Sequence, residues 1–170
     1  MPRRNPLTMQ LFRNLRFVGT MALGALVLAA CSPLMPEKEY KAARAGLADS
    51  IQQERPGTHY IGRRIYKRDY RFWGYLRVPG QPWSSAKLVI FNEQRTYAPD
   101  REMNNLGGDN NHEYIIHGRF SGEKVYEPAS NRAFPEFILT GWSLKSDTPP
   151  PIFRDRRAIE PSVNLFPDPE

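Results

Sequence analysis

The segment Asp69–Val78, with the sequence DYRFWGYLRV, contains an alternating row of cationic and aromatic side chains. Alternate residues of a strand point to the same face, so one face is predicted to carry four of these side chains: Arg71, Trp73, Tyr75 and Arg77. The basic segment Arg63–Arg68, RRIYKR, lies just upstream. Aromatic rings stack on planar ligands, and guanidinium groups hold carboxylates or phosphates. The row therefore predicts a binding site for an anionic ligand. The alternative is that the two aromatic side chains are half-buried beneath another segment while the arginines reach solvent.

The other reactive side chains form no recognisable catalytic or metal-binding motif. The carboxylates between Asp100 and Glu113 do not have the spacing of a calcium-binding loop. His112 and His117 are five residues apart on one predicted strand, so they point to opposite faces and cannot share a zinc ion. The serines lack the context of an activated nucleophile. We therefore expect a non-catalytic protein without a metal or cofactor. A hydrolase whose acidic residues meet only in three dimensions remains an alternative.

The single cysteine of the chain, Cys31, ends an uncharged segment, Val18–Ala30. The segment before it carries four arginines and no acidic residue. A membrane-spanning helix needs about 20 apolar residues, so this apolar segment is too short to remain as a span. A basic segment, a short apolar segment and small residues in that order are typical of a secretory signal peptide.

The four residues Leu28-Ala29-Ala30-Cys31 resemble the lipobox of bacterial lipoproteins. The resemblance implies that residues 1–30 are removed as a signal peptide and that Cys31 receives acyl chains such as palmitate. It also implies an extracytoplasmic, lipid-anchored protein. Ser32 is similar to the residue that follows the cysteine in lipoproteins of the outer membrane facing the periplasm. Two or three acyl chains would anchor the protein stably, because a single chain gives only marginal membrane binding.

The basic character of the full chain comes mainly from the segment before Cys31. The chain has 24 Lys and Arg against 18 Asp and Glu, a net charge of +6. Four of the basic residues and none of the acidic residues precede Cys31, which leaves a net charge of +2. The charge therefore does not indicate a nucleic-acid partner. The expected partners are the membrane, through Cys31, and an envelope protein or an anionic glycan.

The sequence after Cys31 divides into a tether (residues 31–36), a helix (37–55), a β-domain (59–145) and a proline-rich tail (146–170). In the helix, Tyr40, Leu47 and Ile51 recur at helical spacing, and Glu37 can pair with Lys41. The apolar stripe is thin and rich in alanine. We therefore expect this helix to act as a stalk that separates the domain from the membrane.

The region from 59 to 145 consists of short alternating segments separated by turn residues, which is typical of a small all-β domain. Strands are predicted at 69–78, 86–93, 113–122, 136–144 and, more briefly, from 124. Glycines within them, Gly74, Gly118 and Gly141, indicate bends or close backbone approaches. The order of elements resembles an OB-fold, which implies a small barrel of five or six strands. A transthyretin-like β-sandwich is the alternative, because GYLRVPGQPWSSAKLVIFN is similar to the start of such domains.

The tail contains three consecutive prolines at positions 149–151, which favour extended structure over helix or sheet. It also contains apolar residues, so it is predicted either to strap across the domain or to act as a docking peptide. Taken together, the sequence predicts an envelope lipoprotein that acts as a non-catalytic binding or assembly module. The alternative function is a receptor for an anionic glycan or lipid headgroup, and a cell-wall hydrolase is less favoured.

Overall fold

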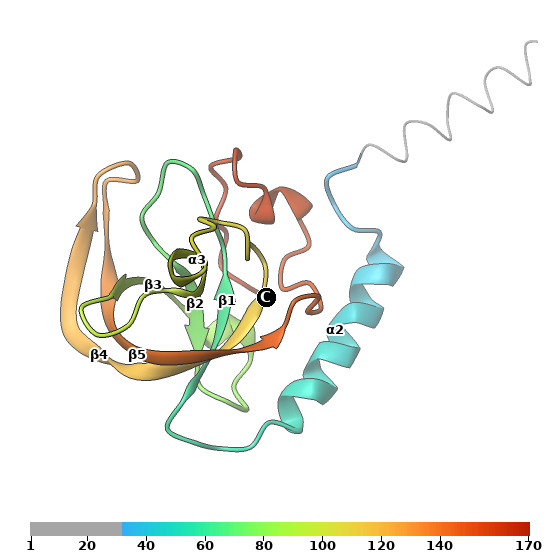
Figure 1. Ribbon diagram of the computed structural model, residues 1–170. Coiled ribbons are helices and arrows are strands. Elements are labelled where there is room, and N and C mark those ends of the chain that lie inside the picture. Colours follow the sequence, from blue (N-terminus) through green and yellow to red (C-terminus); the bar gives the residue numbers. More distant parts are fainter. Residues whose placement is uncertain (1–31) are drawn as a thin grey trace, which may run out of the picture. The chain divides into compact units, whose positions relative to one another are not determined.

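The computed structural model describes residues 32–170, in which five strands close into a barrel (Figure 1). The predicted signal peptide and Cys31 lie outside the described residues. The strands are β1 (Tyr60–Arg64), β2 (Gly74–Arg77), β3 (Lys87–Asn92), β4 (Glu113–Glu127) and β5 (Arg132–Ser146). A short helix, α3 (Pro99–Glu102), lies in the loop between β3 and β4.

The strands follow each other around the barrel in the order β1-β2-β3-β5-β4, and β4 closes the barrel by pairing with β1. All neighbours are antiparallel except β3 and β5, which run parallel. The predicted small barrel is thus confirmed. The order and the single parallel pair agree with the OB-like arrangement, and the sandwich considered as an alternative is not formed.

Two of the three strand glycines are required by close backbone approaches. A Cβ atom on Gly74 would lie 2.1 Å from the carbonyl oxygen of Arg63, and one on Gly118 would lie 2.1 Å from that of Ile138. Gly118 also coincides with a register shift between β4 and β5. Such irregularities bend strands and allow a short sheet to close into a barrel. A Cβ on Gly141 would meet only ordinary contacts, so this glycine has no comparable role.

The buried side chains form two clusters. One fills the interior of the barrel, and the other lies against the outside of its wall. The interior cluster includes Leu76, Val89, Ile116, Phe137 and Leu139. The outer cluster joins Ile61 and Tyr75 of the barrel to the N-terminal helix and to the C-terminal segment, through the side chains of Leu47, Ile51, Trp83, Ile152 and Phe153. The outer cluster therefore holds the two terminal segments against the barrel wall.

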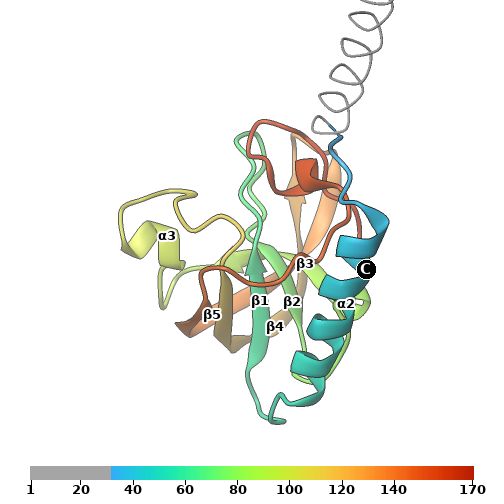
Figure 2. The same cartoon turned by 90° about the vertical axis from the view of Figure 1, so that its right-hand side faces the viewer.

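The N-terminal helix, α2 (Glu37–Gln52), is part of the barrel domain (Figure 2). It begins directly after Pro36, and the predicted ion pair between Glu37 and Lys41 forms at 3.2 Å. However, Leu47 and Ile51 are buried in the outer cluster, so the prediction of a separating stalk is wrong. The thin apolar stripe is sufficient because the C-terminal segment supplies much of the surface that it contacts.

The proline-rich segment after β5 straps across the barrel and is held largely through its carbonyl groups. The hydroxyl of Tyr75 donates a hydrogen bond to the carbonyl of Pro167 at 2.7 Å. The buried ammonium group of Lys67 donates to the carbonyls of Glu160 and Val163 at 2.8 and 2.7 Å. Tyr40 of α2 donates to the carboxylate of Glu170 at 2.6 Å. Side chains of the helix and barrel thus order a segment that forms no strand of the barrel.

A chain of buried ion pairs connects the end of α2 to the barrel. Glu54 accepts two hydrogen bonds from the guanidinium of Arg77, each at 2.6 Å, and one from Lys145 at 2.8 Å. Lys145 also pairs with Glu113, which accepts a hydrogen bond from Arg63 at 2.7 Å. The network therefore links β1, β2, β4 and β5 to Glu54, two residues beyond the end of the helix.

The indole ring of Trp83 completes this network. The guanidinium carbons of Arg63 and Arg77 lie 5.3 and 4.7 Å from its ring centre. Cation–π contacts between desolvated groups contribute roughly 2 kcal/mol each, so the ring offsets part of the cost of burying both cations.

The pH dependence of stability should reveal the contribution of Glu54. Burial alone would raise its pKa, but hydrogen bonds from Arg77, Lys145 and the Gly80 amide lower it to about 2. Because the pKa is lower in the folded state than in the unfolded state, the stabilisation is complete above about pH 5 and is lost as the pH falls from there towards 2. We expect a loss of about 2 kcal/mol in the free energy of unfolding, after allowance for solvent screening.

This loss can be measured by urea unfolding at a series of pH values. In Glu54→Gln the free energy of unfolding should be lower at neutral pH, and it should change less with pH between about pH 5 and 3. Glu123→Gln, at an exposed position of β4, should follow the wild-type curve. Identical acid profiles for the wild type and Glu54→Gln would contradict this assignment.

Candidate functional site

The four side chains of the predicted cationic and aromatic row do not share one face. Trp73 is buried with the barrel-interior cluster, whereas Tyr75 is buried outside the barrel beneath the C-terminal strap. Arg77 is buried in the ion pair with Glu54, and only Arg71 is exposed. The prediction of a single outward face formed by these residues is therefore wrong.

The reason lies at Gly74, where β2 begins. Residues 65–73 form the loop between β1 and β2, so the strict alternation of a strand starts only after Trp73. The backbone amide of Trp73 donates to the carbonyl of Val89 at 2.8 Å, and its ring enters the interior cluster that also contains Leu76. Two side chains three positions apart thus lie on the same side of the chain, which alternation does not allow.

A cavity of about 510 Å³ opens where this β1–β2 loop meets two other parts of the chain. The second wall is formed by the end of β3 and the α3 region, and the third by Val125 and Tyr126 of the β4–β5 hairpin. Aromatic side chains line it from all three walls: Tyr66, Tyr70, Phe72, Trp73, Phe91 and Tyr126. The cationic side chains of its lining are Arg64, Arg68, Arg71 and Arg101. The structure thus brings cationic and aromatic groups together, but with a different membership from the predicted row.

The walls are fixed at the floor of the cavity by Arg64. This guanidinium pairs with Asp100 of α3 at 2.7 Å and donates to the backbone carbonyls of Phe72 and Trp73 in the β1–β2 loop. Asp100 also accepts a hydrogen bond from the amide of Gly107 at 3.0 Å. One buried cation therefore joins the β1–β2 loop to the α3 region.

A second carboxylate, Asp109, lies behind this floor. It is buried, its oxygen lies 3.5 Å from the guanidinium of Arg64, and it accepts a hydrogen bond from the hydroxyl of Tyr114 at 3.0 Å. Burial raises its pKa, Arg64 opposes this shift and Asp100 adds to it. Asp109 does not line the cavity, so its raised pKa reflects its burial among the residues that support the cavity walls.

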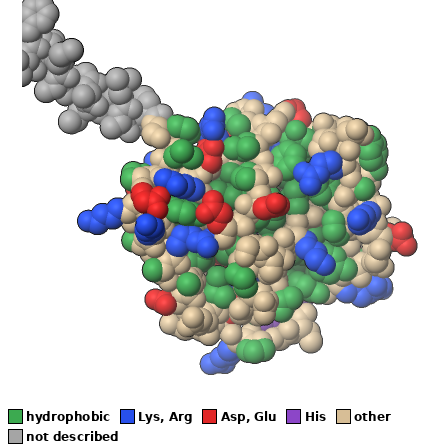
Figure 3. Space-filling model, turned by 180° about the vertical axis from the view of Figure 1, so that it is seen from behind, with side chains coloured by type: hydrophobic (Ala, Val, Ile, Leu, Met, Phe, Trp, Pro, Cys, Tyr) green, Lys and Arg blue, Asp and Glu red, His purple; other side chains and the backbone are tan. Residues whose placement is uncertain are grey.

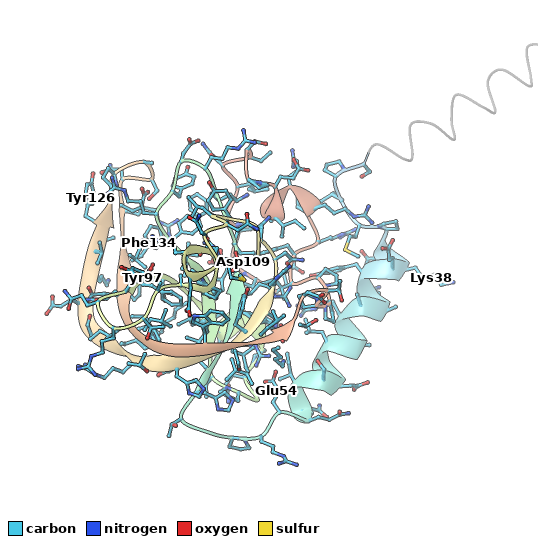
Figure 4. The ribbon with its side chains drawn as sticks, in the orientation of Figure 1. Lys38, Glu54, Tyr97, Asp109, Tyr126 and Phe134 are labelled. Atoms are coloured by element: carbon cyan, nitrogen blue, oxygen red, sulfur yellow. The ribbon has the colours of Figure 1, made fainter. Side chains whose placement is uncertain are left out.

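The hairpin wall is held against the β1–β2 loop by aromatic packing. The ring of Phe72 lies 5.8 Å from that of Phe134 in β5 and 5.4 Å from that of Phe166 in the strap. Tyr70 contacts Phe166 with a centroid distance of 5.0 Å. Figure 4 shows Phe134 and Tyr126 on the hairpin, with Tyr97 on the loop that leads to α3. The strap therefore helps to position one wall of the cavity.

The four cations of the cavity differ in their partners. Arg64 pairs with Asp100, and Arg101 pairs with Glu93 at 3.4 Å. Within residues 32–170, no carboxylate lies within 4.0 Å of the guanidinium groups of Arg68 or Arg71, and both residues are exposed. Glu127 interacts electrostatically with Arg71 at longer range, and its carboxylate accepts hydrogen bonds from the amides of Ala129 and Ser130. Arg68 and Arg71 are therefore the cations that can receive an anionic group.

On the face opposite to the view of Figure 1, basic and acidic side chains are both present and neither forms a continuous patch (Figure 3). Across residues 32–170, no cluster of three or more His, Cys, Asp or Glu side chains is arranged to hold a metal ion. None of the helices in the same range is long and apolar enough to cross a membrane.

Comparison with known proteins gives no relatives: no family model, no curated protein and no solved structure matches this chain.

Sequence reasoning missed several residues of the cavity. Arg68 belongs to the basic segment noted upstream of the row, but nothing in the sequence distinguished it from Arg63, which is fully buried. Tyr126 and Leu106 were missed because they reach the cavity only through the folding of the hairpin and of the α3 loop. The one sequence signal for Leu106 was its own apolar side chain within the polar loop 98–111, which indicates a contact surface.

Truncation of Trp73 should lower stability, because this residue is 4% exposed. Its ring stacks on that of Phe91, with the two ring centroids 4.5 Å apart. We expect Trp73→Ala to lower the free energy of unfolding by about 3–5 kcal/mol. Tyr126→Ala, which removes a ring that is 60% exposed, should change it by less than about 0.5 kcal/mol. Both values come from urea unfolding. If Trp73→Ala had no greater effect than Tyr126→Ala, the assignment of Trp73 to the core would be wrong.

Proposed function

We propose that this protein is a lipid-anchored binding module of the bacterial envelope and that its cavity receives an anionic group from a ligand or partner. The observation that carries the proposal is the pair of exposed guanidinium groups, Arg68 and Arg71, on the wall of an aromatic-lined cavity. Within the described residues neither forms an ion pair within 4.0 Å of a carboxylate, and Arg71 interacts with Glu127 only at longer range. Guanidinium groups form strong, directional hydrogen bonds with carboxylates and phosphates, so the site favours an anion.

The position of the cavity in the fold supports this function. In OB-fold barrels, the loops β1–β2 and β4–β5 and the adjoining strand face bind oligosaccharides and oligonucleotides. The present cavity is bounded by the β1–β2 loop, the end of β3 and the β4–β5 hairpin. The expected extracytoplasmic location favours an envelope component over a nucleic acid.

The carboxylates of the cavity support binding rather than hydrolysis. Glu93 and Asp100 are the acidic residues of its lining, and both are paired with arginines of the same cavity. Asp100 holds Arg64 in place, and Glu93 also accepts a hydrogen bond from the amide of Ala98 at 3.1 Å. These groups position the walls, and a role as proton donor or nucleophile would require them to leave their partners.

The binding function can be tested with the full-length lipidated protein in nanodiscs. Three anionic probes are compared: peptidoglycan fragments, vesicles that contain phosphatidylglycerol, and displayed peptides. The variant Arg68→Ser/Arg71→Ser should weaken binding of the preferred probe by about tenfold or more, because two charge-assisted contacts are lost. Binding should also weaken with added salt.

The matched control is Arg55→Ser/Arg119→Ser, which removes the same charge at exposed positions outside this cavity. It should bind like the wild type. Failure of all three probes to bind, or equal losses in both double variants, would refute the proposed function.

The lipid anchor is tested by labelling growing bacteria with a palmitate analogue that carries an alkyne. The wild-type protein should incorporate the label and appear in the membrane fraction after cleavage before Cys31. Cys31→Ser should incorporate none, because the sulfur that forms the thioether and directs cleavage is absent. Label retained in Cys31→Ser, or a wild-type protein whose Cys31 is unmodified by mass spectrometry, would contradict the anchor.

A further inference from the structure

We propose that the anionic group bound in the cavity belongs to a partner protein, which presents an acidic side chain flanked by apolar residues. This inference rests on the proposed function, namely that the cavity receives an anion. It adds the class of the partner, and it follows from the side chains around the mouth of the cavity.

Exposed large apolar side chains are few in the described residues, and four of them come from the two segments that carry cavity walls, the β3–β4 connection and the hairpin. Tyr97, Met103, Leu106 and Tyr126 are 64, 54, 61 and 60% exposed, and Leu106 and Tyr126 also line the cavity. Leu106 represents the first segment in the cavity lining and Tyr126 the second; Figure 4 labels Tyr97 and Tyr126 on these segments. An apolar group of this size beside a polar site indicates an interaction surface.

The apolar side chains are carried by backbone that is held in place. The indole of Trp142 donates to the carbonyl of Tyr97 at 3.1 Å. The amide of Met103 donates to the carbonyl of Pro99 at 3.0 Å, and that of Gly107 donates to the carboxylate of Asp100. Because Asp100 is itself paired with Arg64, the apolar mouth and the cationic cavity form one preorganised surface. Preorganisation lowers the entropic cost of binding a partner.

The combination of groups fits a polypeptide better than the other anionic candidates. A glycan would stack on the aromatic rings but would place hydroxyl groups against the aliphatic side chain of Leu106. A lipid would need a continuous apolar channel for its chains, whereas the cavity lining includes Glu93 and four arginines. Tyr, Met and Arg are the residue types enriched in the centres of protein interfaces. The volume of about 510 Å³ accommodates a short segment of a partner, with its acidic group at Arg68 and Arg71.

The test uses the full-length protein in nanodiscs and selection from a library of random displayed peptides. Selected peptides should be enriched in Asp or Glu next to Leu, Met or Phe. A synthetic peptide with the most enriched sequence should bind about tenfold more weakly to Leu106→Ser and to Arg68→Ser/Arg71→Ser. Changing its acidic residue to the corresponding amide should reduce binding to the wild type by a similar factor.

Leu144→Ser is the control for the apolar mouth, because Leu144 is 53% exposed on β5 and does not line the cavity. It should bind the peptide like the wild type, and thermal unfolding of all variants verifies that they are folded. The inference would be overturned if Leu106→Ser bound the peptide like the wild type, or if the library yielded no consensus of acidic and apolar residues. If peptidoglycan fragments or phosphatidylglycerol vesicles bound instead and lost affinity in the arginine variant, the proposed function would stand and the protein partner would be refuted. Absence of binding by any probe would refute both.

Discussion

The structure depends on the pairing of two adjacent buried arginines in β1. Arg63 is fully buried on the outer side of the barrel, and Arg64 is buried at the floor of the cavity. An unpaired buried charge costs several kcal/mol, so each guanidinium requires carboxylates and carbonyls around it. Glu113 and the network that ends at Glu54 surround Arg63, while Asp100 and the loop carbonyls surround Arg64. Consecutive strand residues point to opposite faces, so one dipeptide organises both sides of the barrel wall.

This arrangement connects the irregular segments to the cavity. The ion-pair network on the Arg63 side joins α2 to the barrel, and Arg63 also donates to the carbonyl of Pro150 at the start of the strap. The strap in turn places Phe166 against the rings that hold the hairpin wall. On the other side, Arg64 fixes the α3 loop that carries the apolar mouth. The walls of the cavity therefore depend on polar contacts made well away from it.

The sequence predicted the all-β class, the barrel and the α2 helix, because short alternating segments and helical spacing are local properties. It missed β1, since Arg63 and Arg64 interrupt the apolar pattern and their partners are distant in the chain. It predicted two strands where β4 runs unbroken from Glu113 to Glu127. The docking of α2 depends on the C-terminal strap, which no local pattern can place. Of the predicted site residues, only Arg71 lines the cavity as an exposed cation, because Gly74 breaks the alternation on which the prediction relied.

The most direct test of this account is photo-crosslinking in living bacteria, with a photoreactive residue at Leu106 at the mouth of the cavity and, in a second strain, at Leu144. The account predicts a discrete protein adduct at position 106, which is absent at position 144 and is lost when Arg68 and Arg71 are changed to Ser. Equal adducts at both positions, or an adduct at 106 that persists without the two arginines, would contradict the cavity as the binding site.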